Sequence, residues 1–93
     1  MYTDSMRRAF RSLSGPKGFN LQIEDHDHFI TVKAAEKDFM SLTGEDKIQA
    51  VEYMIRVKKA LEDNGAIVLL VREGGKWFLK LFYILYFFYY FLV

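Results

Sequence analysis

Residues 43–65 read TGEDKIQAVEYMIRVKKALEDNG, and they decide the fold because they predict one long amphipathic helix over 45–63. Charged and polar residues recur every three or four positions along one side of this helix. The opposite side is apolar and carries Ala50, Val51, Met54, Val57 and Leu61. Thr43 is a suitable N-cap, because its hydroxyl can accept a hydrogen bond from a first-turn amide. Gly65 predicts the end of the helix, since glycine readily takes the left-handed conformation.

A short apolar run, AIVLLV at 66–71, follows the helix directly. Because this run lacks alternation, it predicts a central strand that is covered on both faces. The residues EGGK at 73–76 predict a tight turn, since two glycines tolerate positive φ at both central positions. A strand after this turn would place three pairs of residues opposite each other: Arg72 with Trp77, Leu70 with Leu79, and Val68 with Leu81.

The stretch before the long helix predicts a first β-hairpin over 19–34. Apolar residues alternate with polar ones in its first half, and 29–34 supply a second β-prone run. Residues 24–27 (EDHD) are predicted as the turn between the two halves. These positions therefore predict a pair of antiparallel strands.

The N-terminal residues 4–13 predict a short helix. Its apolar stripe consists of Met6, Phe10 and Leu13. Residues 14–18 (SGPKG) interrupt regular structure and predict a linker. Together the elements predict a small single-domain α+β protein with two β-hairpins around one long amphipathic helix. We expect this domain to span 1–76, with 77–93 as an apolar aromatic C-terminal segment that completes the core or an interface.

The C-terminal segment, WFLKLFYILYFFYYFLV, holds ten of the chain's sixteen aromatic residues. Such a segment has to be removed from water, so it predicts burial in the fold, contact with a protein or insertion into a lipid bilayer. As a helix its seventeen residues would span about 25 Å, which is short of the roughly 30 Å of a hydrocarbon core. The residues predicted to contact a partner are Trp77, Phe78, Phe82, Tyr83, Tyr86, Phe87 and Tyr90.

Net charge and cysteine content limit the kinds of binding and catalysis that the chain can support. The formal net charge is +1, so no global field points to nucleic acid. The chain has no cysteine, which excludes disulfides, thiolate catalysis and cysteine-ligated metals. His26 and His28 are weak candidates for metal ligands, because they lack a third ligand nearby in the sequence and fit a solvated turn better. Three arginines in the N-terminal helix are candidates for anion binding: Arg7, Arg8 and Arg11.

No grouping of nucleophile, base and acid stands out in the sequence, so we expect no enzymatic activity and no cofactor. The sequence favours a small binding or regulatory protein, of accessory or inhibitor type, that acts through protein–protein contact or self-association. One alternative is a tail-anchored membrane protein with a cytosolic domain. Another alternative, nucleic-acid binding through the N-terminal arginines, is less favoured. We expect a cytoplasmic location, with membrane association under the first alternative.

Overall fold

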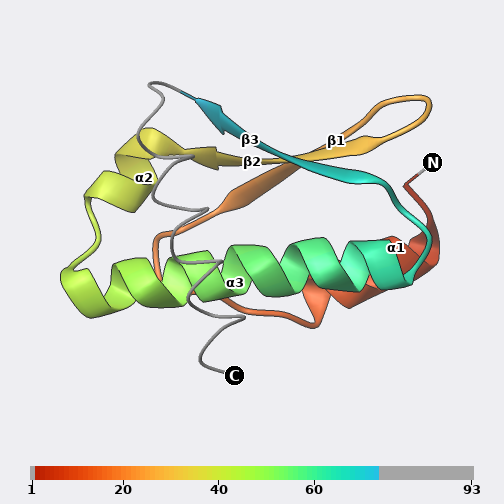
Figure 1. Cartoon of the computed structure of the whole chain (residues 1–93). Helices are drawn as coiled ribbons and strands as arrows, with labels where there is room; N and C mark the ends of the chain where they lie inside the picture. Colours follow the sequence, from red (N-terminus) through yellow and green to blue (C-terminus); the bar gives the residue numbers. More distant parts are fainter. Residues whose placement is uncertain (1, 74–93) are drawn as a thin grey trace, which may run out of the picture.

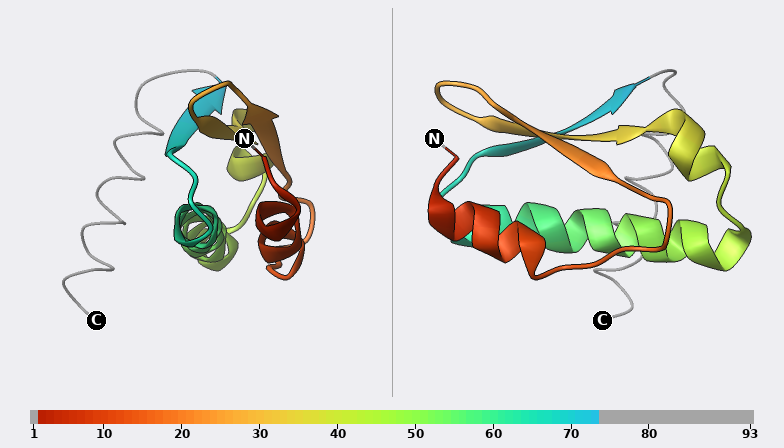
Figure 2. Two further views of the ribbon diagram at one scale, coloured as in Figure 1. Left: turned by 90° about the vertical axis from the view of Figure 1, so that its right-hand side faces the viewer. Right: turned by 180° about the vertical axis from the view of Figure 1, so that it is seen from behind.

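A three-stranded sheet lies over two helices in this computed structural model, which describes residues 2–73 (Figure 1). The elements in chain order are α1 (Asp4–Arg11), β1 (Leu21–Asp25), β2 (Ile30–Ala35), α2 (Glu36–Met40), α3 (Gly44–Asp63) and β3 (Val68–Glu73). Helices α1 and α3 lie side by side beneath the sheet, and the short α2 lies at the end of β2 (Figure 2). The described part of the chain therefore has two layers, with helices on one face of the sheet.

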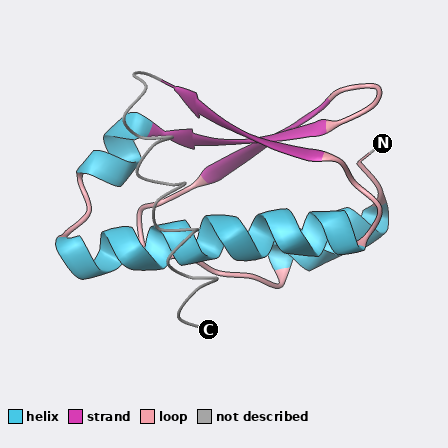
Figure 3. Cartoon of the chain, viewed as in Figure 1, coloured by secondary structure: helices cyan, strands magenta, loops and turns pink. Residues whose placement is uncertain are grey.

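The central strand of this sheet is β2. It pairs antiparallel with β1 and parallel with β3, as the arrows in Figure 3 show. One row of the sheet aligns Ile23, Val32 and Leu70 across the three strands. A parallel neighbour requires a crossover connection, and here α2 and α3 supply it.

The hydrophobic core lies between the sheet and the helices α1 and α3 (Figure 2). Strand β2 contributes Ile30, Val32 and Ala34, all fully buried, because alternate residues of a strand point to the same face. Helix α3 contributes the apolar side chains Ala50, Val51, Tyr53, Met54, Ile55, Val57 and Leu61. Phe19 makes edge-on contacts with the rings of Phe39 and Tyr53, each with ring centroids 6.4 Å apart.

The predicted α+β fold class is confirmed, and the long helix begins one residue before its predicted start. Gly65 adopts a φ of 96°, as the helix end requires. Thr43 is the N-cap, but its predicted bond to a backbone amide is absent. Instead its hydroxyl donates to Asp46 Oδ2 at 3.4 Å.

The first hairpin is confirmed, although its turn lies later than predicted. Strand β1 continues through Asp25, and the turn closes where the amide of His26 donates to the carbonyl of Phe29 at 2.9 Å.

The loop after α1 is irregular, as expected of 14–18, but it packs against the core. Phe19 is buried, and Gly15 lies against Tyr53. The five-residue helix α2 was not predicted by any periodic pattern.

The apolar run 66–71 forms most of a strand, but the prediction that both its faces are covered is wrong. Leu69 and Val71 are exposed, because helices cover only one face of the described sheet. Within residues 2–73, β3 has a strand neighbour only on the side of β2. The predicted second hairpin and the C-terminal segment 77–93 lie outside the described residues.

Candidate functional site

The outer face of the sheet is the face turned away from α1 and α3 (Figure 2), and an apolar row runs along β3 on this face. It consists of Ile67, Leu69 and Val71, whose side chains are 62%, 50% and 36% exposed. Val68, by contrast, is buried, because successive side chains of a strand point to opposite faces. Burial of apolar surface is favourable, so these three neighbouring apolar side chains are a candidate for a contact surface. We call these three residues the outer row.

The outer row borders polar residues on the neighbouring strands. The register places Leu69 beside Thr31 of β2, and Thr31 in turn lies opposite Glu24 of β1. Val71 lies beside Lys33, which is half-buried. The outer face is therefore apolar along β3, at the edge of the described sheet, and polar along the hairpin.

A second group of side chains gathers at the tip of the hairpin. The imidazole of His26 stacks on the ring of Phe29, with centroids 4.6 Å apart and an interplanar angle of 17°. Its Nε2 lies 3.3 Å from the hydroxyl of Thr31 and 3.8 Å from a carboxylate oxygen of Glu24. These contacts give His26 a structural role in packing the turn over Thr31, which is buried.

The predicted metal ligands, His26 and His28, gain no third ligand among the described residues. His28 is exposed, and one ring nitrogen of His26 is within hydrogen-bonding distance of Thr31. Among the described residues no group of three or more histidine, cysteine, aspartate or glutamate side chains could hold a metal ion. Two imidazoles alone make a weak metal site, so the described structure adds no support for metal binding here.

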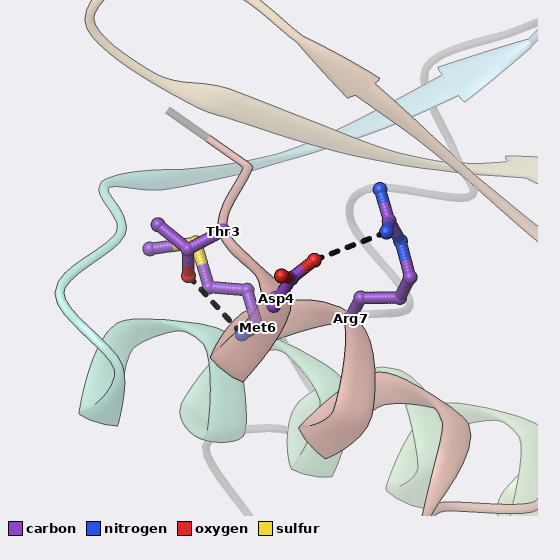
Figure 4. Close-up of polar contacts among 4 residues, drawn as sticks. All are labelled: Thr3, Asp4, Met6 and Arg7. Carbon is purple, nitrogen blue, oxygen red and sulfur yellow. Dashed lines mark hydrogen bonds and ion pairs between the residues drawn. The ribbon is translucent and has the colours of Figure 1, made fainter.

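The N-terminal arginines differ in their surroundings. Figure 4 shows Arg7 directed at Asp4, with Nη1 3.2 Å from Oδ1. The guanidinium of Arg7 also lies 5.7 Å from the centroid of the Tyr2 ring. Arg8 and Arg11 are exposed on the same helix. Two exposed arginines on one short helix are a small basic surface, and anion binding by these residues stays a prediction.

A hydrogen bond from Tyr2 ties the N-terminal stretch to the first hairpin. The amide of Tyr2 donates to Asp25 Oδ2 at 3.0 Å, and this hydrogen bond is the main reason that the pKa of Asp25 lies below its usual value. Burial raises the pKa of the Tyr2 phenol, although the positive charges of Arg7 and Arg11 oppose that shift. The contact fixes the start of α1 beneath the tip of the first hairpin.

The predicted partner-contact residues at 77–90 lie outside the described residues. Within the described part, no helix is both long enough and apolar enough to cross a bilayer. The exposure of the outer row does not follow from the sequence pattern, because an apolar run such as 66–71 predicts a strand covered on both faces. The small number of predicted helices could have indicated an exposed face, because α1 and α3 can cover only one face of a sheet.

Comparison of the chain with protein-family models, with curated proteins and with solved structures finds no match.

Proposed function

We propose that this chain is a small protein-binding module without catalytic activity, and that it contacts another polypeptide through the outer face of its sheet. The observation that carries the proposal is the outer row, because its three exposed apolar residues lie close together, two on β3 and Ile67 directly before it. The apolar aromatic segment 77–93 follows β3 almost at once in the sequence, so the strongest apolar features of the chain are neighbours.

Two other large apolar residues are exposed, and they can be compared with the outer row. Ile48 of α3 is 51% exposed and Met40 of α2 is 47% exposed, but each is a single residue on its own helix. Scattered apolar side chains are normal on protein surfaces, whereas a contiguous set marks an interaction site. The outer row is therefore the surface to test.

A photocrosslinking experiment in the native cells tests the proposal. A benzoylphenylalanine replaces Leu69 in the full-length chain, and a control chain carries it at Arg56, an exposed residue of α3. We expect a discrete adduct to a polypeptide from position 69 and none from position 56. The additional substitution Val71→Lys should abolish that adduct, while Ile48→Lys should leave it unchanged.

The same experiment separates the alternatives. Adducts to lipid alone would contradict the proposal and favour membrane association, and adducts to nucleic acid would favour the arginine-based alternative. Equal adducts from positions 69 and 56 would show that the outer face has no special role. An adduct of twice the chain mass, about 22 kDa against 11.0 kDa, would identify the polypeptide as a second copy.

A further inference from the structure

The chain has four serines, and Ser14 differs from the others in its surroundings. Ser14 is exposed and lies in the irregular loop after α1. The nearest backbone hydrogen bonds on its two sides are donated by the amides of Leu13 and Phe19. No backbone hydrogen bond among the described residues involves Ser14 itself. Another protein can therefore bind this residue in an extended conformation without breaking a helix or a strand.

The other three serines belong to helices or to their caps. Ser5 lies in the first turn of α1. Ser12 is the C-cap of α1, and its hydroxyl donates to the carbonyl of Ala9 at 2.7 Å. Ser41 is the C-cap of α2, and its hydroxyl donates to the carbonyl of Asp38 at 2.8 Å. Within the described part of the chain, the serine of the loop is therefore the one that lies outside the helices and their caps.

The sequence on both sides of Ser14 is basic. Between Asp4 and Glu24 the chain has no acidic residue and four basic ones: Arg7, Arg8, Arg11 and Lys17. Arg11 is the last residue of α1, three positions before Ser14, and its side chain is exposed. Some serine kinases select their substrates by charge, with acidic groups that bind an arginine before the serine. The loop therefore combines an accessible hydroxyl with the positive charge that such a kinase recognises.

We propose that Ser14 is a phosphorylation site for an arginine-directed serine kinase, with Arg11 as the main recognition residue. The proposal goes beyond the proposed function, because it concerns the loop beside α1 and not the outer row. In the reaction the hydroxyl oxygen of Ser14 attacks the γ-phosphorus of ATP. A new O–P bond forms while the bond from the γ-phosphorus to the bridging oxygen breaks and ADP leaves, and the serine proton passes to a carboxylate of the kinase.

The phosphate on Ser14 is then flanked by positive charge. A phosphoserine carries a charge of about −2 at pH 7 and presents three acceptor oxygens. Arg11 and Lys17 lie three positions before and after Ser14, and both side chains are exposed. The C-terminal end of α1 disfavours a nearby anion, because the helix dipole is negative there. A charge-assisted hydrogen bond from the guanidinium of Arg11 offsets this effect.

Phosphorylation of the full-length chain in vitro tests the site. The probe is a calcium/calmodulin-dependent protein kinase, which selects an arginine three positions before the serine, together with magnesium ATP. Tandem mass spectrometry assigns the phosphate to a residue, so the site is located on the unaltered sequence. We expect phosphate on Ser14 and less than about a tenth of that amount on Ser12, because the Ser12 hydroxyl is already bonded within its helix.

Two matched variants test the role of the arginine. Arg11→Gln should lower the kcat/KM of the kinase for this chain about tenfold or more, because a charge-assisted contact is lost. Arg56→Gln, at an exposed arginine of α3, should leave kcat/KM unchanged. If thermal denaturation shows that Arg11→Gln does not fold, Arg11→Ala replaces it, since alanine is the stronger helix former. Absence of phosphate from Ser14, phosphate mainly on another serine, or equal kcat/KM for the two variants would overturn the proposal.

Discussion

The ring of Tyr53 lies against the backbone of Gly15, and a Cβ atom at Gly15 would be 2.5 Å from Tyr53 Cδ2. This relationship joins the loop after α1 to the middle of α3, where Tyr53 is buried. Phe19, at the other end of the same loop, contacts the Tyr53 ring edge-on. The loop is therefore part of the packed structure, and Gly15 is required by the lack of space beside Tyr53 and not by its backbone conformation.

Gly15→Ala should destabilise the protein, because the added methyl group overlaps the ring of Tyr53. Overpacking of this kind costs about 1–3 kcal/mol, which corresponds to a decrease in melting temperature of roughly 5–20 °C for a domain of this size. The control is Gly44→Ala, because a Cβ at Gly44 meets nothing within 4 Å. Thermal denaturation should show an unchanged or slightly higher melting temperature for this control. Equal losses for both variants would contradict the steric explanation.

The two threonine N-caps should differ in their contribution to stability. Thr3 Oγ1 accepts a hydrogen bond from the amide of Met6 at 3.3 Å, as Figure 4 shows, whereas Thr43 makes no such bond. Thr3→Ala should therefore lower the free energy of unfolding by about 1 kcal/mol. Thr43→Ala should lower it by less than about half of that amount, because no helix amide loses its acceptor. Urea denaturation followed by circular dichroism measures both values, and a larger loss at Thr43 would contradict the assignment.

Stability at high pH should depend on Tyr53. Burial raises the pKa of this phenol above its usual value of 10, so the folded chain keeps the proton at a pH where the unfolded chain has lost it. The resulting stability is fully present below pH 10 and is lost as the pH rises through the raised pKa. Tyr53→Phe should make the melting temperature fall less steeply between about pH 9 and about pH 11. Tyr2→Phe, at a less buried position, should change this slope less.

Stability at low pH should depend on Asp25. The amide of Tyr2 favours the ionised form and lowers the pKa of this carboxyl below 3.8. Its contribution is present above the unfolded pKa and is lost as the pH falls through the lowered, folded value. Asp25→Asn should therefore flatten the decrease in melting temperature below about pH 4. Asp27→Asn, at another exposed carboxyl of the same hairpin, is the control, and equal flattening by both substitutions would contradict the role of the Tyr2 contact.

A lysine in the outer row should change binding without changing the fold. Leu69→Lys should remove contact with the partner, while the free energy of unfolding stays within about 0.5 kcal/mol of the original value, as for most surface substitutions. Ile48→Lys is the matched control, since Ile48 and Leu69 are 51% and 50% exposed. Crosslinking yield and urea denaturation are measured on the same full-length variants. Equal effects on binding would show that general surface hydrophobicity, and not the outer row, controls association.

Helices α1 and α3 and the first hairpin could be predicted because their signals are local. Helix α3 has a repeating apolar face and a glycine at its end, and both follow from residues within one or two turns. The end of β1 could not be found in this way. Asp25 suits a turn by residue type, but it belongs to a strand paired with Ile30 and accepts a bond from Tyr2, far away in the sequence.

The direction of β3 and the exposure of the outer row depend on the arrangement of whole elements. An apolar run such as 66–71 fits a strand buried on both faces, and nothing within the run reports how many helices are present to cover it. The parallel pairing of β3 with β2 likewise follows from the crossover through α2 and α3. Helix α2 has only five residues, which is too short for a periodic pattern to be recognised.

The separation of β2 from β3 along the chain has a consequence for biosynthesis. Residues 36–67 lie between these strands, so a ribosome adding 5–20 residues per second releases β3 roughly 2–7 s after β2. Until then the nascent polypeptide holds its helices but only two of the three described strands, and a two-stranded sheet is marginally stable by itself. The edge of β2 that later receives β3 is exposed throughout this interval. Chaperones that recognise extended apolar segments can therefore engage this protein before translation reaches β3.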